Sequence, residues 1–600
     1  MATTRLRRDE VPDIETWDLS KLIPTDQVFK NELKEIPQAA KKLIKWKGKV
    51  IQDAKTLFDV LEAYTNLKIR LIHLDTYASL KLFGDTTNTK NQMDEAQANS
   101  VITEAQSVLT FIVDELYSLD ETRIQTFIDE EPQLRTYSIY LNRLLDLKPY
   151  RLSAETEQTL ASLSEVLQAP YSIYKYSKLA DMQFQPVIDR DGNEQPVSFA
   201  LYEGKYEASD DTVLRRNAYD SFTQTLNQYK HTFATIYATE VKKEIALAKL
   251  RGYQSATEAL LKRQHVTKEM YDNQLDIISQ ELAPHYRRYA RLKQNVLGLD
   301  KMTFPDLKAP LSTYNPPISF EESKKSILEA LEVMGADYLS IIKQAFDERW
   351  IDYADNIGKS TGGFCSSPYG APSYILLTWT NQIRNMFTLA HELGHCGHFQ
   401  LSNKHQHLVN TRASMYFIEA PSTLNELILT QHLRKRATTD QMKTWITDQL
   451  LGTYYHNFVT HLLEGVYQRK VMNHAEKGNP INADVLTKFK LDTLKDFWGD
   501  SVEIMDRDGL TWMRQPHYYM GLYSYTYSAG LTVATVVSQQ FEAEGQAAVD
   551  RWLSVLKSGG CLSPQELIEK ANVDILNPDT IRQAVRYVGS LITEVESYYS

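Results

Sequence analysis

The chain has 600 residues, of which 42% are hydrophobic and 24% charged, and its formal net charge is −11. This length exceeds what one hydrophobic core usually organises, so we expect at least two subdomains. The acidic balance argues against a nucleic-acid partner, and no apolar run approaches the length needed to cross a membrane. The three cysteines lie too far apart in the sequence to suggest a disulfide framework, which predicts a reducing, cytoplasmic location.

The first third of the chain shows apolar residues recurring every three and four positions, which predicts amphipathic helices. The clearest of these predicted helices are 37–47, 53–82, 91–117 and 154–167. Next, two extended runs flank an Asp-Gly turn near residue 191, and this pattern predicts a β-hairpin over 182–206. We place a boundary at its end, between an N-terminal helical lobe, 1–205, and a second domain, 206–600.

Helical periodicity resumes after the boundary, and a loop and a strand follow it. The predicted helices are 212–229, 231–250, 268–282, 285–297, 321–334 and 337–348. The loop 361–370 contains Gly362 and Gly363, which permit close approach of the backbone to another group. The segment 373–380, SYILLTWT, has the composition of a strand. A small β-sheet is therefore expected directly before the next helix.

That next helix carries HELGH at 391–395, which is the pattern H-E-x-x-H. His391 and His395 are four residues apart, so they share one helical face and can bind one metal ion, and Glu392 is placed to reach a water on that metal. A catalytic zinc needs three protein ligands and one open position. The elongated metzincin pattern would supply a third histidine at position 401, but this position is Leu401.

A carboxylate from a following helix is the alternative third ligand. No Asp or Glu occurs over 396–418, and the first acid is Glu419, 24 residues after His395 (419 − 395). A span of this length can leave one helix, turn, and return in another, so Glu419 is the predicted ligand. Glu426 lies two helical turns further along the same face, where it can orient His391 or His395 as a hydrogen-bond acceptor.

Three other histidines lie close to the motif in sequence. His398 shares the face of the two predicted ligands, and we interpret it as a packing residue. His405 and His407 lie in a polar turn and are expected to be solvated. They remain alternative metal ligands if Glu419 does not bind the metal.

HELGH followed by FIEAPSTLNE at 417–426 resembles the thimet oligopeptidase family of zinc metallopeptidases, and specifically its oligoendopeptidase F branch. The resemblance covers the chain from about residue 14 to about residue 585. It implies a mainly α, two-lobed helical metallopeptidase that encloses a deep substrate channel. It also implies that 1–205 is the family's N-terminal region and that 206–600 is the catalytic domain with one Zn²⁺ per chain.

The stretch 515–528 is rich in tyrosine, a composition that more often serves packing than chemistry. Amide hydrolysis at zinc creates an oxyanion, however, and a neutral phenol or histidine can stabilise it. The family has a histidine followed by tyrosines here, so the resemblance assigns transition-state binding to His517 and Tyr525, with Tyr523 and Tyr527 as neighbouring candidates. It also favours 373–380 as a substrate-binding edge strand, beside a substrate-binding loop at Gly362 and Gly363.

Together these patterns predict a zinc endopeptidase of short oligopeptides in which Glu392 is the general base. One alternative is a carboxypeptidase or dipeptidyl-carboxypeptidase, which would need a cationic group to hold the terminal carboxylate of its substrate. Another is a helical peptide-binding protein with an inactive site or a structural zinc. A structural zinc is expected to have four ligands, often with Cys, whereas Cys396 points about 100° away from His395 on the helix. The oligomeric state stays open.

Overall fold

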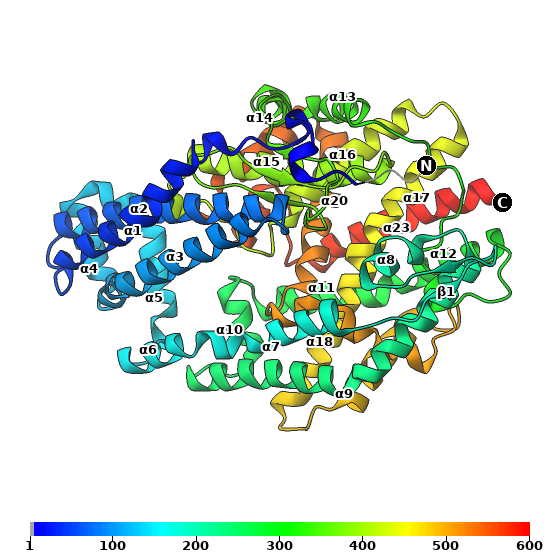
Figure 1. The fold of residues 1–600 in the computed structure, drawn as a ribbon, viewed down its shortest axis with the longest axis horizontal. Helices are drawn as coiled ribbons and strands as arrows, with labels where there is room; N and C mark the ends of the chain where they lie inside the picture. The colour runs from blue at the N-terminus through cyan, green and yellow to red at the C-terminus, as the bar shows by residue number, and fades with distance from the viewer. Residues whose placement is uncertain (1–4) are drawn as a thin grey trace.

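The computed structural model describes residues 5–600, and 73% of the chain is helical. The predicted mainly α fold with small sheets is confirmed. Figure 1 shows the first five helices gathered at one end of the long axis and the C-terminal helix α23 near the other end. Among the described residues, no helix is both long enough and apolar enough to span a membrane.

The N-terminal helices bury a hydrophobic cluster of their own, with Phe29, Leu57 and Leu109 among its members. Tyr374 and Leu376, from much later in the chain, complete this cluster. The helices are α1 (Asp26–Leu43), α2 (Ala54–Gly84), α3 (Thr89–Leu116), α4 (Glu121–Glu130) and α5 (Ser138–Leu147). The bounds of the predicted helix 37–47 are wrong, because α1 is capped by the Thr25 side chain and Pro37 lies inside the helix.

The middle of the chain contains longer helices than the sequence pattern suggests, and a short hairpin of β1 (Val187–Ile188) and β2 (Glu194–Gln195). The predicted break at residue 230 is absent, because no helix-breaking residue interrupts the 39 residues of α9. The predicted helix 154–167 is two helices. The elements are α6 (Ala154–Ser162), α7 (Ser164–Tyr176), α8 (Phe199–Gly204), α9 (Thr212–Leu250), α10 (Ala256–Arg263), α11 (Lys268–Glu281), α12 (Ala283–Val296), α13 (Phe320–Ala330) and α14 (Gly335–Asp347).

The predicted small sheet has three strands, β3 (Ile351–Asp352), β4 (Phe364–Ser366) and β5 (Tyr374–Leu376). Their order is β3-β5-β4, with β5 parallel to β3 and antiparallel to β4. The prediction that the segment 373–380 forms a free edge is therefore wrong for Tyr374–Leu376. Both sides of β5 are paired, and its three residues are fully buried, so the outer strand on this side is β4.

The C-terminal helices bury a second hydrophobic cluster, which runs in sequence from Tyr174 to Val595. Among them, α16 packs against both α15 and α20 (Figure 1). A π-helical turn, Tyr455–Thr460, joins α17 to α18. The helices are α15 (Ile383–His405), α16 (Glu419–Arg436), α17 (Asp440–Tyr454), α18 (His461–Glu476), α19 (Ala483–Trp498), α20 (Ser524–Glu544), α21 (Gln546–Ser558), α22 (Pro564–Lys570) and α23 (Pro578–Tyr599). The boundary near residue 205 stays a prediction.

Candidate metal centre and the aromatic group beside it

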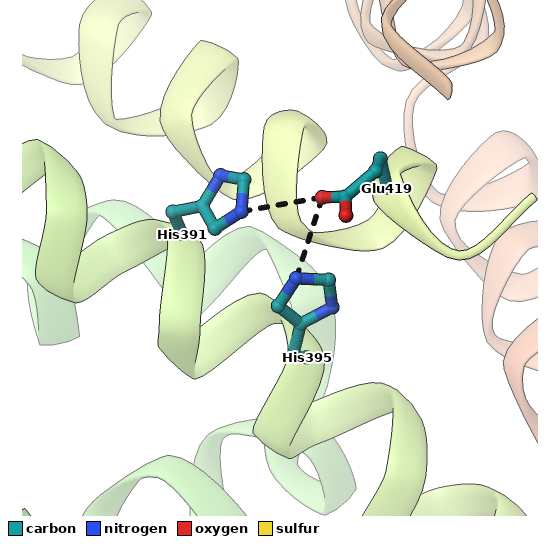
Figure 2. Close-up of side chains that lie close together, drawn as sticks. All are labelled: His391, His395 and Glu419. Atoms are coloured by element: carbon teal, nitrogen blue, oxygen red, sulfur yellow. Dashed lines mark ion pairs between the residues drawn. The ribbon is translucent and has the colours of Figure 1, made fainter. Parts of the chain in front are cut away.

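Three predicted ligands meet where α15 crosses the start of α16 (Figure 2). Glu419 Oε2 lies 3.3 Å from His391 Nε2 and 3.4 Å from His395 Nε2. Two atoms that each bind a tetrahedral Zn²⁺ at about 2.0–2.1 Å are themselves about 3.3–3.4 Å apart. The spacing therefore suits a tetrahedral zinc ion. Within residues 5–600, this is the one group of three His, Cys, Asp or Glu side chains found close enough to hold a metal.

Two glycines allow the start of α16 to lie between α15 and α20. A Cβ atom added to Gly394 would lie 2.5 Å from Ser422 Cα, and one added to Gly530 would lie 2.7 Å from Glu419 Cβ. Both separations are shorter than a van der Waals contact, so any other residue would push the helices apart. Gly394 within HELGH thus has a structural role, because it lets the backbone that carries Glu419 approach the two histidines.

Hydrogen bonds hold the predicted ligands in place. His391 Nδ1 donates to Glu426 Oε1 over 2.7 Å, and Thr453 Oγ1 donates to Glu426 Oε2 over 2.9 Å. Because the carboxylate accepts at Nδ1, the lone pair of His391 is left on Nε2, facing Glu419. Burial alone would raise the pKa of Glu419, but the charges and hydrogen bonds of the two histidines outweigh it and hold that pKa well below its ordinary value.

Glu392 lies beside the cluster with its carboxylate free of hydrogen-bond donors among residues 5–600. Its side chain is buried, with 6% of the residue exposed. Burial raises its pKa, and the neighbouring charges of His391 and His395 partly oppose this rise. The loop before β4 passes close by, since a Cβ atom added to Gly363 would lie 3.4 Å from Glu392 Oε1, while Gly362 has a φ of +91°. Gly363 thus brings backbone to this carboxylate, and Gly362 permits the left-handed turn just before it.

An aromatic group formed by His517, Tyr523 and Tyr527 lies beside the predicted metal ligands. His517 stacks on Tyr523 with ring centroids 5.2 Å apart, and its Nε2 is 3.4 Å from the Tyr527 hydroxyl. Burial, aided by the charge of Lys178, lowers the pKa of His517 to about 4. Burial and then the charge of Glu419 raise the pKa of Tyr523 to about 12. At neutral pH the histidine is neutral and Tyr523 keeps its phenolic proton.

Tyr525 is not brought to this group. Its hydroxyl donates to Gln264 Oε1 over 2.6 Å, and its ring packs edge-on against Tyr271. The reason is helical geometry: Tyr523 and Tyr527 are four residues apart at the start of α20 and share a face, whereas Tyr525 lies about 200° away.

Two histidines that the sequence patterns missed extend the aromatic group. The His461 ring stacks on Tyr527 with centroids 4.2 Å apart, and His461 Nε2 lies 3.1 Å from His456 Nε2. Residues five apart do not share an α-helical face, but a π-helical turn brings them together. The turn Tyr455–Thr460 supplies this geometry. The α-helical spacing of three or four residues therefore gives no sequence signal for this pair.

The alternative ligands His405 and His407, and the neighbouring His398, are not part of the cluster. Both ring nitrogens of His398 are buried without a hydrogen-bond partner, and burial lowers its pKa to about 3. His405 Nδ1 donates to the carbonyl oxygen of Leu401, and His407 packs edge-on against Tyr137. His398 is thus buried, as expected of a packing residue, and His405 is exposed, as expected. The expected solvation of His407 is wrong, because its ring is half-buried against Tyr137.

Comparisons with known proteins identify the family of the chain. The model of peptidase family M3 matches residues 205–587, and the model described as Oligopeptidase F matches residues 115–184. The chain is 32% identical to oligopeptidase PepF of Bacillus subtilis over 98% of this chain and 88% of that protein. It is 28% identical to group B oligopeptidase PepB of Streptococcus agalactiae over 98% of both chains.

A solved structure extends the likeness to the fold. The crystal structure of oligoendopeptidase-F from Enterococcus faecium superimposes with a TM-score of 0.75 and 25% identity, covering 95% of this chain and 99% of that one. The fold and the site thus define a metalloendopeptidase of oligopeptides. The chain belongs to peptidase family M3, and the resemblance to oligoendopeptidase F is confirmed.

Proposed function

We propose that this endopeptidase uses one Zn²⁺, held by His391, His395 and Glu419, to hydrolyse internal bonds of short oligopeptides. The distances from Glu419 Oε2 to the two histidine nitrogens, 3.3 and 3.4 Å, carry the proposal, because they match those between ligands of a tetrahedral zinc ion. Zinc bound there would polarise the scissile carbonyl and lower the pKa of a water molecule. Two histidines and one carboxylate with an open fourth position suit zinc and leave room for that water.

Glu392 is the proposed general base. Its carboxylate accepts no hydrogen bond from the described residues, so it is available to a water molecule. Burial raises its pKa toward the working pH, which favours both the uptake and the release of a proton. Glu392 takes the proton from the attacking water and passes it to the leaving amide nitrogen.

Tyr527 and Tyr523 are the proposed donors to the oxyanion. Both phenols have a raised pKa, so both keep a proton to donate. His517 Nδ1 donates to Gln515 Oε1 over 3.1 Å, which leaves Nε2 to accept the single proton of the Tyr527 hydroxyl 3.4 Å away before reaction. That proton turns from His517 to the oxyanion as the negative charge develops. The role of Tyr525 stays a prediction, and the engagement of its hydroxyl by Gln264 favours a packing role.

Short peptides are the proposed substrates because the site is enclosed. The side chains of His391, His395 and Glu419 are 24%, 12% and 8% exposed. An extended short peptide can reach such a site, whereas a folded protein cannot present its backbone there. We further propose that residues 1–205 form a lobe that shields the catalytic domain, 206–600. The three free cysteines suit a cytoplasmic location.

Glu392→Gln tests the mechanism. We expect it to bind zinc as the wild type does and to lower kcat by about 10²–10⁴-fold, because the general base is lost while the ligands remain. The substrate is an internally quenched peptide with an amidated C-terminus, and mass spectrometry identifies the products.

A chelator that stops internal cleavage and zinc that restores it would support the proposal. Normal turnover by Glu392→Gln would contradict the role of the base. Cleavage that requires a free C-terminus would favour a C-terminal trimming enzyme.

A further inference from the structure

Arg384 is an exposed cation on the face of α15 that carries the predicted metal ligands. It precedes His391 by seven residues, so the two side chains lie two helical turns, about 10 Å, apart on the same face. No described side chain forms a hydrogen bond or an ion pair with its guanidinium. An accessible guanidinium therefore faces the same side of the helix as the proposed zinc site.

The helix itself does not explain this arginine. Arg384 lies in the first turn of α15, where the helix dipole disfavours a cation. The capping contacts belong to Asn385, whose Oδ1 accepts hydrogen bonds from the backbone N–H groups of Thr380 and Gln382. An unpaired charge at an electrostatically unfavourable position, with no structural contact to compensate, is a feature found at functional sites.

His456 lies in the π-helical turn Tyr455–Thr460 and is also exposed. Its Nε2 contacts His461, which connects it to Tyr527. The protein packed around its other sides, and then the positive charges of Lys308 and Arg384, lower its pKa to about 3, so both cations act on this imidazole. Lys308 forms an ion pair with Glu207. Unlike Lys308, Arg384 has no ion-pair partner among the described residues.

We propose that Arg384, assisted by His456, forms a subsite that binds a carboxylate group of the peptide substrate. A guanidinium donates two parallel hydrogen bonds to a carboxylate, and a neutral imidazole can supply a third donor. An extended peptide advances about 3.3 Å per residue, so the carboxylate belongs about three residues from the cleaved bond. It is either an Asp or Glu side chain or the terminal carboxylate. This inference rests on the proposed peptidase function and deepens it.

Matched peptides test the subsite. One quenched sequence is made with Glu, Gln or Lys three residues to either side of the cleaved bond, each with an amidated C-terminus, and the Gln peptide is also made with a free C-terminus ending at the third residue. In the wild type we expect kcat/KM to be about tenfold higher for a carboxylate-bearing peptide than for its neutral, amidated twin, as is typical of one charge-assisted contact. The arm that shows the preference identifies the source of the carboxylate.

The variants Arg384→Gln and Arg384→Glu separate the subsite from general effects. We expect Arg384→Gln to bring the ratio between the twins to about one, and Arg384→Glu to favour the Lys peptide. Lys404→Gln is the matched control, because Lys404 is an exposed cation in the last turn of the same helix, and it should keep the wild-type ratio. Equal ratios in the wild type and in Arg384→Gln would overturn the proposal.

The Kd of each labelled peptide is also measured by fluorescence anisotropy on the Glu392→Gln variant, and the Kd values of the carboxylate-bearing and neutral peptides are compared. Binding does not depend on turnover, so a failure of the peptidase mechanism would leave this measurement able to support or overturn the subsite. We expect Arg384→Gln, introduced into the Glu392→Gln background, to abolish the preference for the carboxylate-bearing peptide. A preference that persists there would contradict the proposal.

Discussion

The metal half and the aromatic half of the site are built in different ways. In the metal half, backbones touch at Gly394 and Gly530, and short hydrogen bonds hold the ligands, as between His391 and Glu426. In the aromatic half, rings pack at centroid distances of 4.2–5.6 Å, and the distance from the Tyr527 hydroxyl to His517 Nε2 is long for a hydrogen bond, at 3.4 Å.

The difference indicates that the two halves have different functional requirements. Ligands of a metal must be held within tenths of an ångström, and touching helices supply that precision. Donors to an oxyanion need to meet a charge that develops during the reaction, and stacked rings can shift slightly to do so. Gly521, with a φ of +70°, lies in the connection between His517 and α20 and permits a turn there that other residues rarely adopt.

The largest expected effect is at the metal half. Glu419→Ala should lose zinc and all measurable activity, because a two-histidine site cannot hold the ion. Zinc content by mass spectrometry and cleavage of the quenched peptide are the measurements, with circular dichroism to verify folding. If the folded variant kept one zinc per chain, Glu419 would not be a ligand.

At the aromatic half, Tyr527→Phe should keep zinc and lower kcat by about 10²–10³-fold, as the loss of one oxyanion donor does elsewhere. Tyr525→Phe is its control, and kcat should change little because the Tyr525 hydroxyl contacts Gln264 instead. Steady-state kinetics on both variants decide between them. A larger loss for Tyr525→Phe would reverse the assignment that the contacts favour.

Gly394→Ala tests whether the close backbone contact between α15 and α16 determines the geometry of the metal half. The added methyl group would lie 2.5 Å from Ser422 Cα, so we expect a loss of about 1–3 kcal/mol in unfolding free energy and weaker zinc binding. Gly452→Ala is the control, since a Cβ atom there meets nothing within 4 Å in the exposed face of α17. It should be neutral or stabilising. Denaturant titration and zinc competition assays give both quantities.

The smallest expected effect is on the pH dependence of folding stability. The pKa of His517 is about 4 in the folded protein, below its ordinary value of 6.5, so the unfolded chain binds a proton that the folded chain does not. Stability should therefore fall as the pH drops from about 6.5 to 4. His517→Gln should show a smaller fall over this window in urea unfolding, whereas the exposed His231→Gln should behave as the wild type. Parallel curves for all three proteins would contradict the assignment.

Local patterns in the sequence were enough to predict which residues come together in the metal half. Helical periodicity, the four-residue spacing of His391 and His395 and the acid-free stretch before Glu419 all depend on residues near one another in the chain. The helix ends were less predictable, as at α1, where a threonine cap twelve residues before Pro37 (37 − 25) sets the start. The mainly helical fold class could be predicted because the helical period repeats over many residues, so errors at single positions matter little.

Tertiary structure alone decided the remaining features. The position of β5 as the middle strand depends on its pairing with β3 and β4. The choice between Tyr525 and Tyr527 depends on which face of α20 meets His517, and the pairing of His456 with His461 depends on a π-helical turn. The absence of a partner for Arg384 among residues 5–600 is also a long-range property. Each feature is a contact between segments distant in sequence, and local propensity carries no record of such contacts.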